Sequence, residues 1–144
     1  MADDARYMKL ALTEAKEAYR RDEVPIGAVV VLNDMVIGRG HNLTETLSDV
    51  TAHAEIQAIT AAEQTIGSKY LEGCTIYVTV EPCVMCAGAM YWAKIARLVY
   101  GAPDDKYGYT QVSPAALHPK TTVTSGVLAD DCAQLMKDFF KNKR

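Results

Sequence analysis

The sequence has no long apolar run. Its longest apolar stretch near the start, residues 26–32, is far shorter than the ~20 residues that a membrane-spanning helix needs. The first ten residues contain Asp3 and Asp4 and lack an apolar segment behind a basic start, so we expect no signal peptide. These features predict a cytoplasmic protein that does not enter a membrane.

A strong excess of one charge is also missing. The chain has 15 lysine and arginine residues against 18 aspartate and glutamate residues, which gives a formal net charge of −3. This balance argues against a general polyanion binder, and we expect no binding to DNA. It leaves room for a local basic patch, because net charge does not describe how charges are distributed over a surface.

Cysteine is scarce, with four residues in the chain: Cys74, Cys83, Cys86 and Cys132. Four cysteines would suit disulfides in a small secreted domain. In a chain of this size without an export signal, paired cysteines more often bind a metal or take part in chemistry. We expect Cys74 and Cys132, which belong to no motif, to be small buried apolar groups.

The length and composition are those of one globular unit. A chain of 144 residues is close to the ~150 that a single domain typically takes. Its hydrophobic content of 49% and charged content of 23% are near the averages for folded domains. No internal repeat or low-complexity segment is present, and we expect a single domain over residues 1–144.

Hydrophobic periodicity predicts an α/β fold. The predicted helices cover residues 3–21, 52–66, 83–93 and a last segment from 128, and the predicted strands cover 26–32, 35–39, 75–80, 95–100 and 121–124. The turn Asn33-Asp34 joins the first two strands in a hairpin, and strand, helix and strand over 75–100 are typical of a parallel βαβ unit. This order predicts a three-layer α/β/α domain with a mixed five-stranded sheet flanked by helices.

Two polar segments separate these elements. Residues 40–50 and 101–120 are expected to be irregular, and loops as long as the second are usually functional in compact domains. Thr51 is the expected N-cap of the helix over residues 52–66, because its hydroxyl can accept a hydrogen bond from a free backbone N–H group.

Cys83 and Cys86 lie in the segment 81–86 (EPCVMC), at a predicted helix start. Residues three apart occupy neighbouring positions on one helix face. The free N–H groups and positive dipole end of a helix start favour thiolates, and two thiolates suit Zn²⁺. The spacing alone also fits a redox pair or two buried reduced thiols.

His53 and Glu55 lie in a second segment, 51–55 (TAHAE), also at a predicted helix start. Positions two apart on a helix point roughly 200° away from each other, so both side chains can face one metal only if the helix begins there. One histidine and two cysteines leave a fourth position open, which is typical of catalytic zinc, and Glu55 beside it would carry protons. Taken singly, His53 could be a capping or surface histidine and Glu55 a solvated carboxylate.

Together these segments match the H-x-E and P-C-x-x-C signature of zinc nucleobase deaminases. On these motifs the chain resembles the cytidine deaminase-like superfamily and, most closely, the bacterial tRNA adenosine deaminases, over nearly its full length. The closer resemblance also rests on the segments 23–28 (EVPIGA), 40–42 (GHN), 71–75 (LEGCT), 81–90, 126–128 (GVL) and Phe139-Phe140.

The resemblance implies a reaction and a cofactor. It implies that the wobble adenosine of a tRNA anticodon is converted to inosine with release of ammonia. It implies a homodimer with one Zn²⁺ per subunit, held by His53, Cys83 and Cys86, and proton transfer by Glu55.

The resemblance also implies positions that contact substrate. Asn42 and the backbone at Ala54 would contact the flipped-out base, and the loop residues Asp104 and Lys106 would meet the RNA. From the residues alone, Asn42 could merely shape a turn, and Asp104 and Lys106 could be a solvated pair in a loop.

The chain departs from the family pattern in residues 107–111 (YGYTQ), which replace the usual small residues. Tyr107 and Tyr109 could stack on unpaired anticodon bases or pack on the partner subunit. Tyr91 and Trp92, which follow the cysteine pair, are expected to anchor the core or a subunit contact.

Two other functions remain open from the sequence. A free nucleobase or nucleoside deaminase of the same superfamily, acting on cytosine or guanine, would use the same zinc chemistry. A non-catalytic zinc module that binds RNA or a protein would need a fourth protein ligand, for which the candidates are His41, His118, Cys74 and Cys132.

Overall fold

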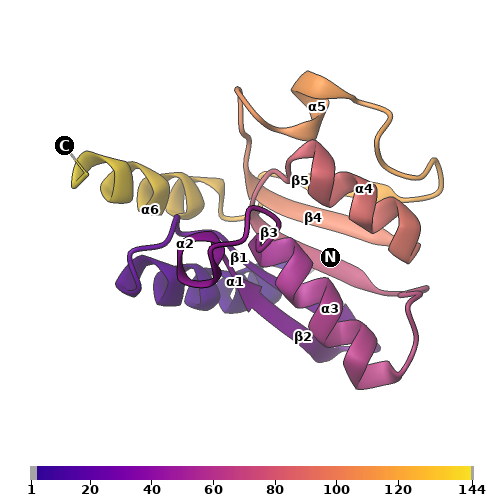
Figure 1. Ribbon diagram of the computed structural model, residues 1–144. Coiled ribbons are helices and arrows are strands. Elements are labelled where there is room, and N and C mark those ends of the chain that lie inside the picture. Colours follow the sequence, from indigo (N-terminus) through magenta and orange to yellow (C-terminus); the bar gives the residue numbers. More distant parts are fainter. Residues whose placement is uncertain (1–2, 144) are drawn as a thin grey trace.

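The computed structural model describes residues 3–143, in which six helices and five strands follow one another (Figure 1). Their bounds are α1 Asp4–Arg20, β1 Gly27–Leu32, β2 Met35–His41, α2 Thr44–Leu47, α3 Ala54–Ile66, β3 Thr75–Val80, α4 Val84–Ala93, β4 Arg97–Ala102, α5 Tyr109–Val112, β5 Thr122–Ser125 and α6 Ala129–Lys141. The strand order is β2-β1-β3-β4-β5. Strand β1 is antiparallel to β2 and β3, whereas β3, β4 and β5 are parallel. The predicted mixed five-stranded sheet is confirmed.

The hairpin of β1 and β2 sets the position of α3. Asn33 and Asp34 have φ angles of 51° and 62°, which a two-residue hairpin turn of type I′ requires. At Gly40 in β2 an added Cβ would lie 2.5 Å from the carbonyl oxygen of Ala54. Glycine therefore lets the first turn of α3 lie directly against the strand.

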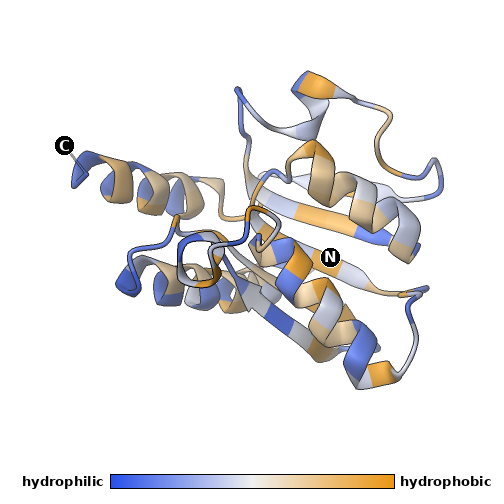
Figure 2. Ribbon diagram, in the orientation of Figure 1, coloured by the Kyte–Doolittle hydropathy of each residue, from blue (hydrophilic) through white to orange (hydrophobic). Residues whose placement is uncertain are grey.

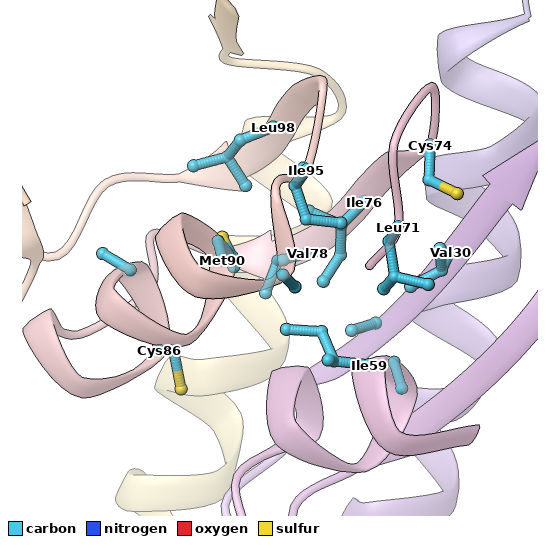
Figure 3. Close-up of a cluster of buried hydrophobic side chains, with 14 of the residues drawn as sticks. Val30, Ile59, Leu71, Cys74, Ile76, Val78, Cys86, Met90, Ile95 and Leu98 are labelled. Carbon is cyan, nitrogen blue, oxygen red and sulfur yellow. The ribbon is translucent and has the colours of Figure 1, made fainter. Parts of the chain in front are cut away.

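Helices cover both faces of the sheet (Figure 1). Helices α1 and α6 pack on one face in a cluster that includes Met8, Val29 and Val99. Helices α3 and α4 pack on the other face around Ile76 and Met90, and Figure 3 draws this second cluster. Hydrophilic and hydrophobic residues alternate along α1 and α6 (Figure 2), as in helices with one solvent face. Within residues 3–143, no helix has the length and apolar character needed to cross a bilayer.

Helix α1 is also fixed to the sheet by a buried carboxylate. Asp4 accepts hydrogen bonds from Arg97 at 2.8 and 2.6 Å and from the Tyr77 hydroxyl at 2.9 Å. The Arg97 guanidinium holds the pKa of Asp4 well below its usual range. Because Arg97 also donates to Thr124 at 3.0 Å, the network joins α1 to β3, β4 and β5.

The starts of two helices differ from the prediction. The N-cap of α3 is His53 and not Thr51. The hydroxyl of Thr51 instead donates to Asp49 at 2.7 Å, because a local turn engages it before the helix begins. In the same way Cys83 is the N-cap of α4, and the helix begins one residue later than expected.

The two segments expected to be irregular each contain a short helix. Helix α2 lies in residues 40–50 and α5 lies in residues 101–120, and β4 ends at Ala102 instead of residue 100. Buried carboxylates of Glu23 and Glu81 accept hydrogen bonds from backbone N–H groups of these short helices. Such long-range contacts leave no trace in local periodicity, so the prediction of irregular structure missed these two short helices.

Candidate active site

Two helix starts meet beyond the carboxyl end of β3. His53 and Cys83 are the N-cap residues of α3 and α4, and both have an extended backbone. Cys86 lies in the first turn of α4 and is fully buried. The Nδ1 atom of His53 lies 3.6 Å from the sulfur of Cys83 and 3.6 Å from the sulfur of Cys86. The fold thus brings together the two motifs that the sequence separates.

The three side chains fit a tetrahedral metal ion. Their ligand atoms all lie within 4.8 Å of one another, and within residues 3–143 no other group of three His, Cys, Asp or Glu side chains is so placed. With Zn–S bonds of about 2.3 Å and Zn–N bonds of about 2.0–2.1 Å, tetrahedral angles separate nitrogen from sulfur by about 3.6 Å. Both N–S distances match this value, so the group could hold zinc.

The two thiols differ in acidity because they share a hydrogen bond. The hydrogen bond from Cys86, aided by His53, lowers the pKa of Cys83 to about 4. The same hydrogen bond, together with burial, raises the pKa of Cys86. The hydrogen bond with Cys83 also raises the pKa of His53. The site therefore stabilises one thiolate by itself, and a divalent cation would favour the second.

Glu55 lies in the first turn of α3 and is 3% exposed. Burial raises its pKa to about 7, a value suited to a group that takes and returns a proton near neutral pH. Its carboxylate is not part of the group of mutually close ligand atoms. Glu55 is therefore beside the candidate metal group and not one of its members.

A cleft of about 750 Å³ opens over these residues. We call its inner lining, made by His53, Glu55 and Cys83, the floor. The outer lining, here called the rim, consists of residues 103–107 together with Met136, Lys137 and Phe140 of α6. The predicted residues Asp104 and Lys106 thus lie on the same cleft as the metal group.

Asn42 and Ala54 line a second cavity of about 220 Å³, which shares His53 and Glu55 with the cleft. Asn42 is 6% exposed, and its Oδ1 atom accepts a hydrogen bond from the N–H group of Thr44 at 3.3 Å. This is the one hydrogen bond of its side chain among the described residues, so its two amide N–H donors remain for a ligand. The turn-forming role considered for Asn42 is real and is compatible with a role in binding.

The loop after β4 is shaped by its own acidic residue. The Asp104 carboxylate accepts hydrogen bonds from the N–H groups of Lys106 and Tyr107, both at 3.0 Å. Tyr109 is buried in the core that includes α3 and α4, whereas Tyr107 is 70% exposed and lines the rim. Of the two tyrosines, Tyr107 is the one that a base could reach.

Two buried acidic residues near the cavities were not predicted from the sequence. Glu23 is fully buried and Glu81 is 5% exposed. Both lie in segments that the family resemblance matched, and Glu81 directly precedes the P-C-x-x-C motif, so a signal was present. Lys137 and Phe140 were also missed as parts of the cleft, because periodicity assigns them only to an amphipathic helix.

No candidate for a fourth protein ligand lies near the group in the described part of the chain. His41 pairs with a carboxylate of α1 at 3.0 Å, and Nδ1 of His118 accepts a backbone hydrogen bond at 3.0 Å. Cys74 and Cys132 are buried elsewhere as expected, and all four cysteines are free. This arrangement favours an open fourth position over a closed structural site.

Trp92 was expected to anchor either the core or a subunit contact, and it does not lie in the core. It is 76% exposed at the end of α4. The ring of Tyr91, which is also exposed, lies 5.4 Å from the Trp92 ring and 5.2 Å from the His118 ring. The three aromatic side chains form a surface group, and its use in a subunit contact stays a prediction.

A mixed sheet that supports a His/Cys/Cys group at two helix starts, with a buried glutamate beside it, defines a protein of the nucleobase deaminase class. The family model for MafB19-like deaminases accordingly matches residues 2–144. The tRNA-specific adenosine deaminase of Agrobacterium fabrum (strain C58 / ATCC 33970) is 46% identical over 149 residues, which cover 100% of this chain and 98% of the relative. The chain belongs to the family of tRNA-specific adenosine deaminases.

Solved structures agree with this assignment. A structure from studies of A-to-I editing by tRNA:A34 deaminases at the wobble position of transfer RNA is 47% identical, with a TM-score of 0.85 over 90% of this chain and 98% of that chain. The guanine deaminase of Bacillus subtilis is 37% identical, with a TM-score of 0.66 over 76% of this chain and 68% of that chain. The predicted fold of the cytidine deaminase-like superfamily is confirmed.

Proposed function

We propose that the protein is a zinc-dependent hydrolytic deaminase that converts the wobble adenosine of a tRNA anticodon to inosine. The observation that carries this proposal is the convergence of His53, Cys83 and Cys86 at two helix starts, with Glu55 beside them at the floor of a cleft. The identity to tRNA-specific adenosine deaminases supports adenosine in tRNA as the substrate.

The metal group and Glu55 would divide the chemistry. His53 through Nδ1 and the sulfurs of Cys83 and Cys86 would hold one Zn²⁺ per chain, which leaves a position open to water. When bound, zinc supplies the Lewis acidity that makes water a nucleophile at neutral pH. The Glu55 carboxylate takes a proton from the attacking water and delivers protons to the ring nitrogen and to the leaving amine. One C–O bond forms at C6 of adenine, one C–N bond breaks, and ammonia is released.

Binding would use both cavities. The Asn42 amide and the backbone at Ala54 contact the flipped-out base in the smaller cavity. Asp104 and Lys106 meet the RNA at the rim, where the Lys106 ammonium can pair with a phosphate. Tyr107 offers an exposed ring on which an unpaired base can stack, as is common in the recognition of single-stranded RNA.

We further propose that residues 1–144 act as a single deaminase domain in a cytoplasmic homodimer. The exposed Trp92 and the neighbouring Tyr91 support a subunit contact at the end of α4, because aromatic residues are enriched in such interfaces. Light scattering on the wild-type protein and on Trp92→Ala tests this. A monomeric wild-type protein, or a variant that dimerises as well as wild type, would contradict the proposed contact.

The reaction is tested with an anticodon stem-loop that carries adenosine at the wobble position. We expect mass spectrometry to detect inosine after incubation with the zinc-loaded protein, and far less inosine after the same time with Glu55→Ala. An unchanged stem-loop would overturn the proposed function.

A second candidate function is deamination of a free base, which the likeness to the guanine deaminase of Bacillus subtilis favours. The same zinc chemistry serves both reactions, so the substrate decides between them. Incubation with free guanine and free cytosine in parallel with the stem-loop separates the two candidates. Ammonia release from a free base alone would establish the second.

A further inference from the structure

The loop between β4 and α5 is held by one buried carboxylate. The Oε1 atom of Glu81 accepts a hydrogen bond from the N–H group of Asp104 at 3.1 Å. Its Oε2 atom accepts two more from Thr110, from the N–H group at 3.1 Å and from the hydroxyl at 2.7 Å. Glu81 thus binds the loop at both of its ends, Asp104 and Thr110. Lys106 and Tyr107, which lie between these two residues, are exposed at the rim.

A side chain at position 108 would collide with the Glu81 carboxylate. A Cβ on Gly108 would lie 2.2 Å from Oε2 of Glu81. The φ angle of Gly108 is −59°, which any residue adopts, so the close approach and not backbone conformation requires glycine. The loop is built around this carboxylate.

The same loop is bonded to the segment that carries Cys83. The N–H group of Tyr109 donates to the carbonyl oxygen of Pro82 at 2.9 Å, and Cys83 and Gly108 form an isolated antiparallel bridge. Glu81 directly precedes Pro82, so residues 81–83 contact the loop in two ways. The backbone of Pro82 and Cys83 pairs with it, and the Glu81 side chain accepts its hydrogen bonds.

We propose that Glu81 is a positioning residue for substrate recognition, which holds residues 104–110 so that Lys106 and Tyr107 face the RNA. This inference rests on the proposed function. Glu81 lines the cleft, but both of its carboxylate oxygens accept hydrogen bonds from residues 104 and 110, so we assign it no part in the reaction itself. It acts on binding through the loop and leaves the proton transfer to Glu55.

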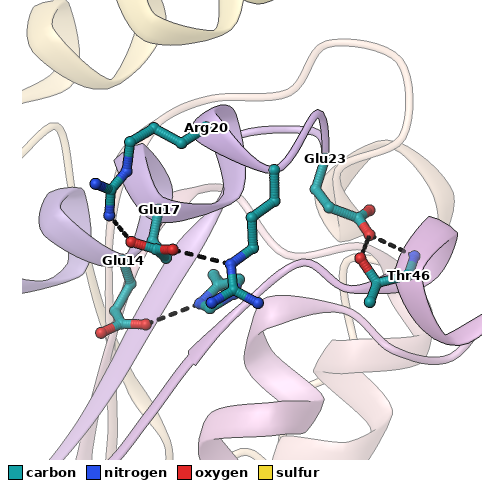
Figure 4. Close-up of polar contacts among 7 residues, drawn as sticks. Glu14, Glu17, Arg20, Glu23 and Thr46 are labelled. Atoms are coloured by element: carbon teal, nitrogen blue, oxygen red, sulfur yellow. Dashed lines mark hydrogen bonds and ion pairs between the residues drawn. The ribbon is translucent and has the colours of Figure 1, made fainter.

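A matching arrangement beside the smaller cavity, which Val24, Asn42 and Thr44 line, supports this role. Glu23 accepts hydrogen bonds from the N–H groups of Glu45 at 3.1 Å and Thr46 at 2.6 Å, and from the Thr46 hydroxyl at 2.6 Å. Figure 4 shows Glu23 reaching Thr46 from outside α2. The segment that Glu23 holds directly follows Asn42. A buried glutamate thus accepts hydrogen bonds from two backbone N–H groups and one threonine hydroxyl beside each of the two cavities.

The test compares Glu81→Gln with wild type in the zinc-loaded protein. Glutamine keeps one acceptor oxygen but turns an NH₂ group toward a donor. We expect KM for the anticodon stem-loop to rise about tenfold, as for the loss of a charged hydrogen bond, with kcat and zinc content within about twofold of wild type. Hydrogen–deuterium exchange of the peptide over residues 104–110 should become faster.

Further variants separate positioning from general destabilisation. Thr110→Val removes the hydroxyl that reaches Glu81 and should raise KM in the same direction, whereas Thr110→Ser should restore the wild-type value. These two variants keep the inference testable if Glu81→Gln does not fold. Asp4→Asn, which breaks a buried carboxylate network remote from the cleft, should lower stability and leave KM unchanged.

The outcomes distinguish this inference from the proposed function. A Glu81→Gln protein with unchanged exchange over residues 104–110 overturns the inference, whether or not the RNA is a substrate. So does a variant that loses zinc or kcat while KM stays constant, because Glu81 would then serve the Cys83 segment. A wild-type protein that leaves the stem-loop unmodified overturns the proposed function instead, and the exchange measurement still decides whether Glu81 holds the loop.

Discussion

The floor and the rim of the cleft are built in different ways. The floor consists of buried or half-buried side chains at two helix starts, where the backbone itself directs each group. The rim consists of an exposed loop and one face of α6, and a buried carboxylate shapes that loop. Chemistry and recognition are therefore separable in this protein. Substitutions in the floor should lower the rate of turnover, and those in the rim should change affinity.

The largest effect is expected when the metal group is broken. Cys86→Ala removes one of the three side chains, so bound zinc should fall far below one ion per chain and deamination should drop to background. Metal analysis and inosine formation measure the two losses. Cys74→Ala is the matched control, because it removes a buried thiol outside the group and should keep zinc. Full zinc content in Cys86→Ala would remove Cys86 from the ligand set.

Glu55→Ala should separate proton transfer from metal binding. Glu55 is outside the group of mutually close ligand atoms, so zinc content and fold should be retained. We expect kcat to fall by about 10²–10⁴-fold, the typical contribution of a positioned acid or base. Single-turnover kinetics on the stem-loop give this value. A wild-type rate in the variant would show that the role assigned to Glu55 is wrong.

In the rim, Tyr107→Ala should act on affinity alone. The Tyr107 ring is exposed, so the melting temperature should not change. Loss of one stacked base should raise KM about tenfold, with kcat unchanged. Tyr109→Phe is the control, because Tyr109 is buried and should not touch RNA. An equal KM for Tyr107→Ala and wild type would remove this ring from the binding surface.

A smaller effect is expected from the charge on α6. Lys137 lines the cleft, and if its ammonium neutralises one phosphate, Lys137→Gln should reduce the slope of log affinity against log salt by about 1. Binding titrations at several salt concentrations measure this slope. Lys9→Gln, on the groove between α1 and α6, should leave it unchanged. Equal slopes for both variants would place the phosphate path elsewhere.

The smallest effect on function is expected outside the cleft, at Asp4. Its pKa is lower in the folded state than in the unfolded state, because Arg97 donates to its carboxylate. The stabilisation is therefore complete above the unfolded value of about 3.9 and is lost as the pH falls through the lower folded value. Urea unfolding at a series of pH values should show this loss, and Asp4→Asn should flatten it. Activity at neutral pH should differ little in the variant.

Local pattern in the sequence was enough for most of the fold and for the floor. The βαβ unit and the Asn33-Asp34 hairpin follow from short-range periodicity and turn chemistry, and both are confirmed. The proximity of His53 to the two cysteines was predicted because the two motifs together supply three zinc ligands and match the deaminase signature, and it is confirmed. The placement of Asp104 and Lys106 near the floor was expected only through the family resemblance.

What could not be predicted depends on contacts between distant residues. Thr51 was expected to cap α3, but Asp49 engages its hydroxyl first. Hydropathy does not predict that Glu81 is buried beneath an exposed loop, because a charged residue is ordinarily assigned to the surface. Tyr107 and Tyr109 have the same side chain and opposite exposures, and only the three-dimensional course of the loop distinguishes them.

The two helix starts belong to different halves of the chain. Helix α3 packs on the β1–β2 hairpin, whereas α4 connects the parallel strands β3 and β4. A metal ion bound by His53, Cys83 and Cys86 would cross-link these two halves. The cross-link would close the loop of chain between residues 53 and 83. Removal of the metal by a chelator should therefore weaken the hydrophobic contact between α3 and α4 as well as stop turnover. The free energy of unfolding would then measure the fraction of chains that hold the ion.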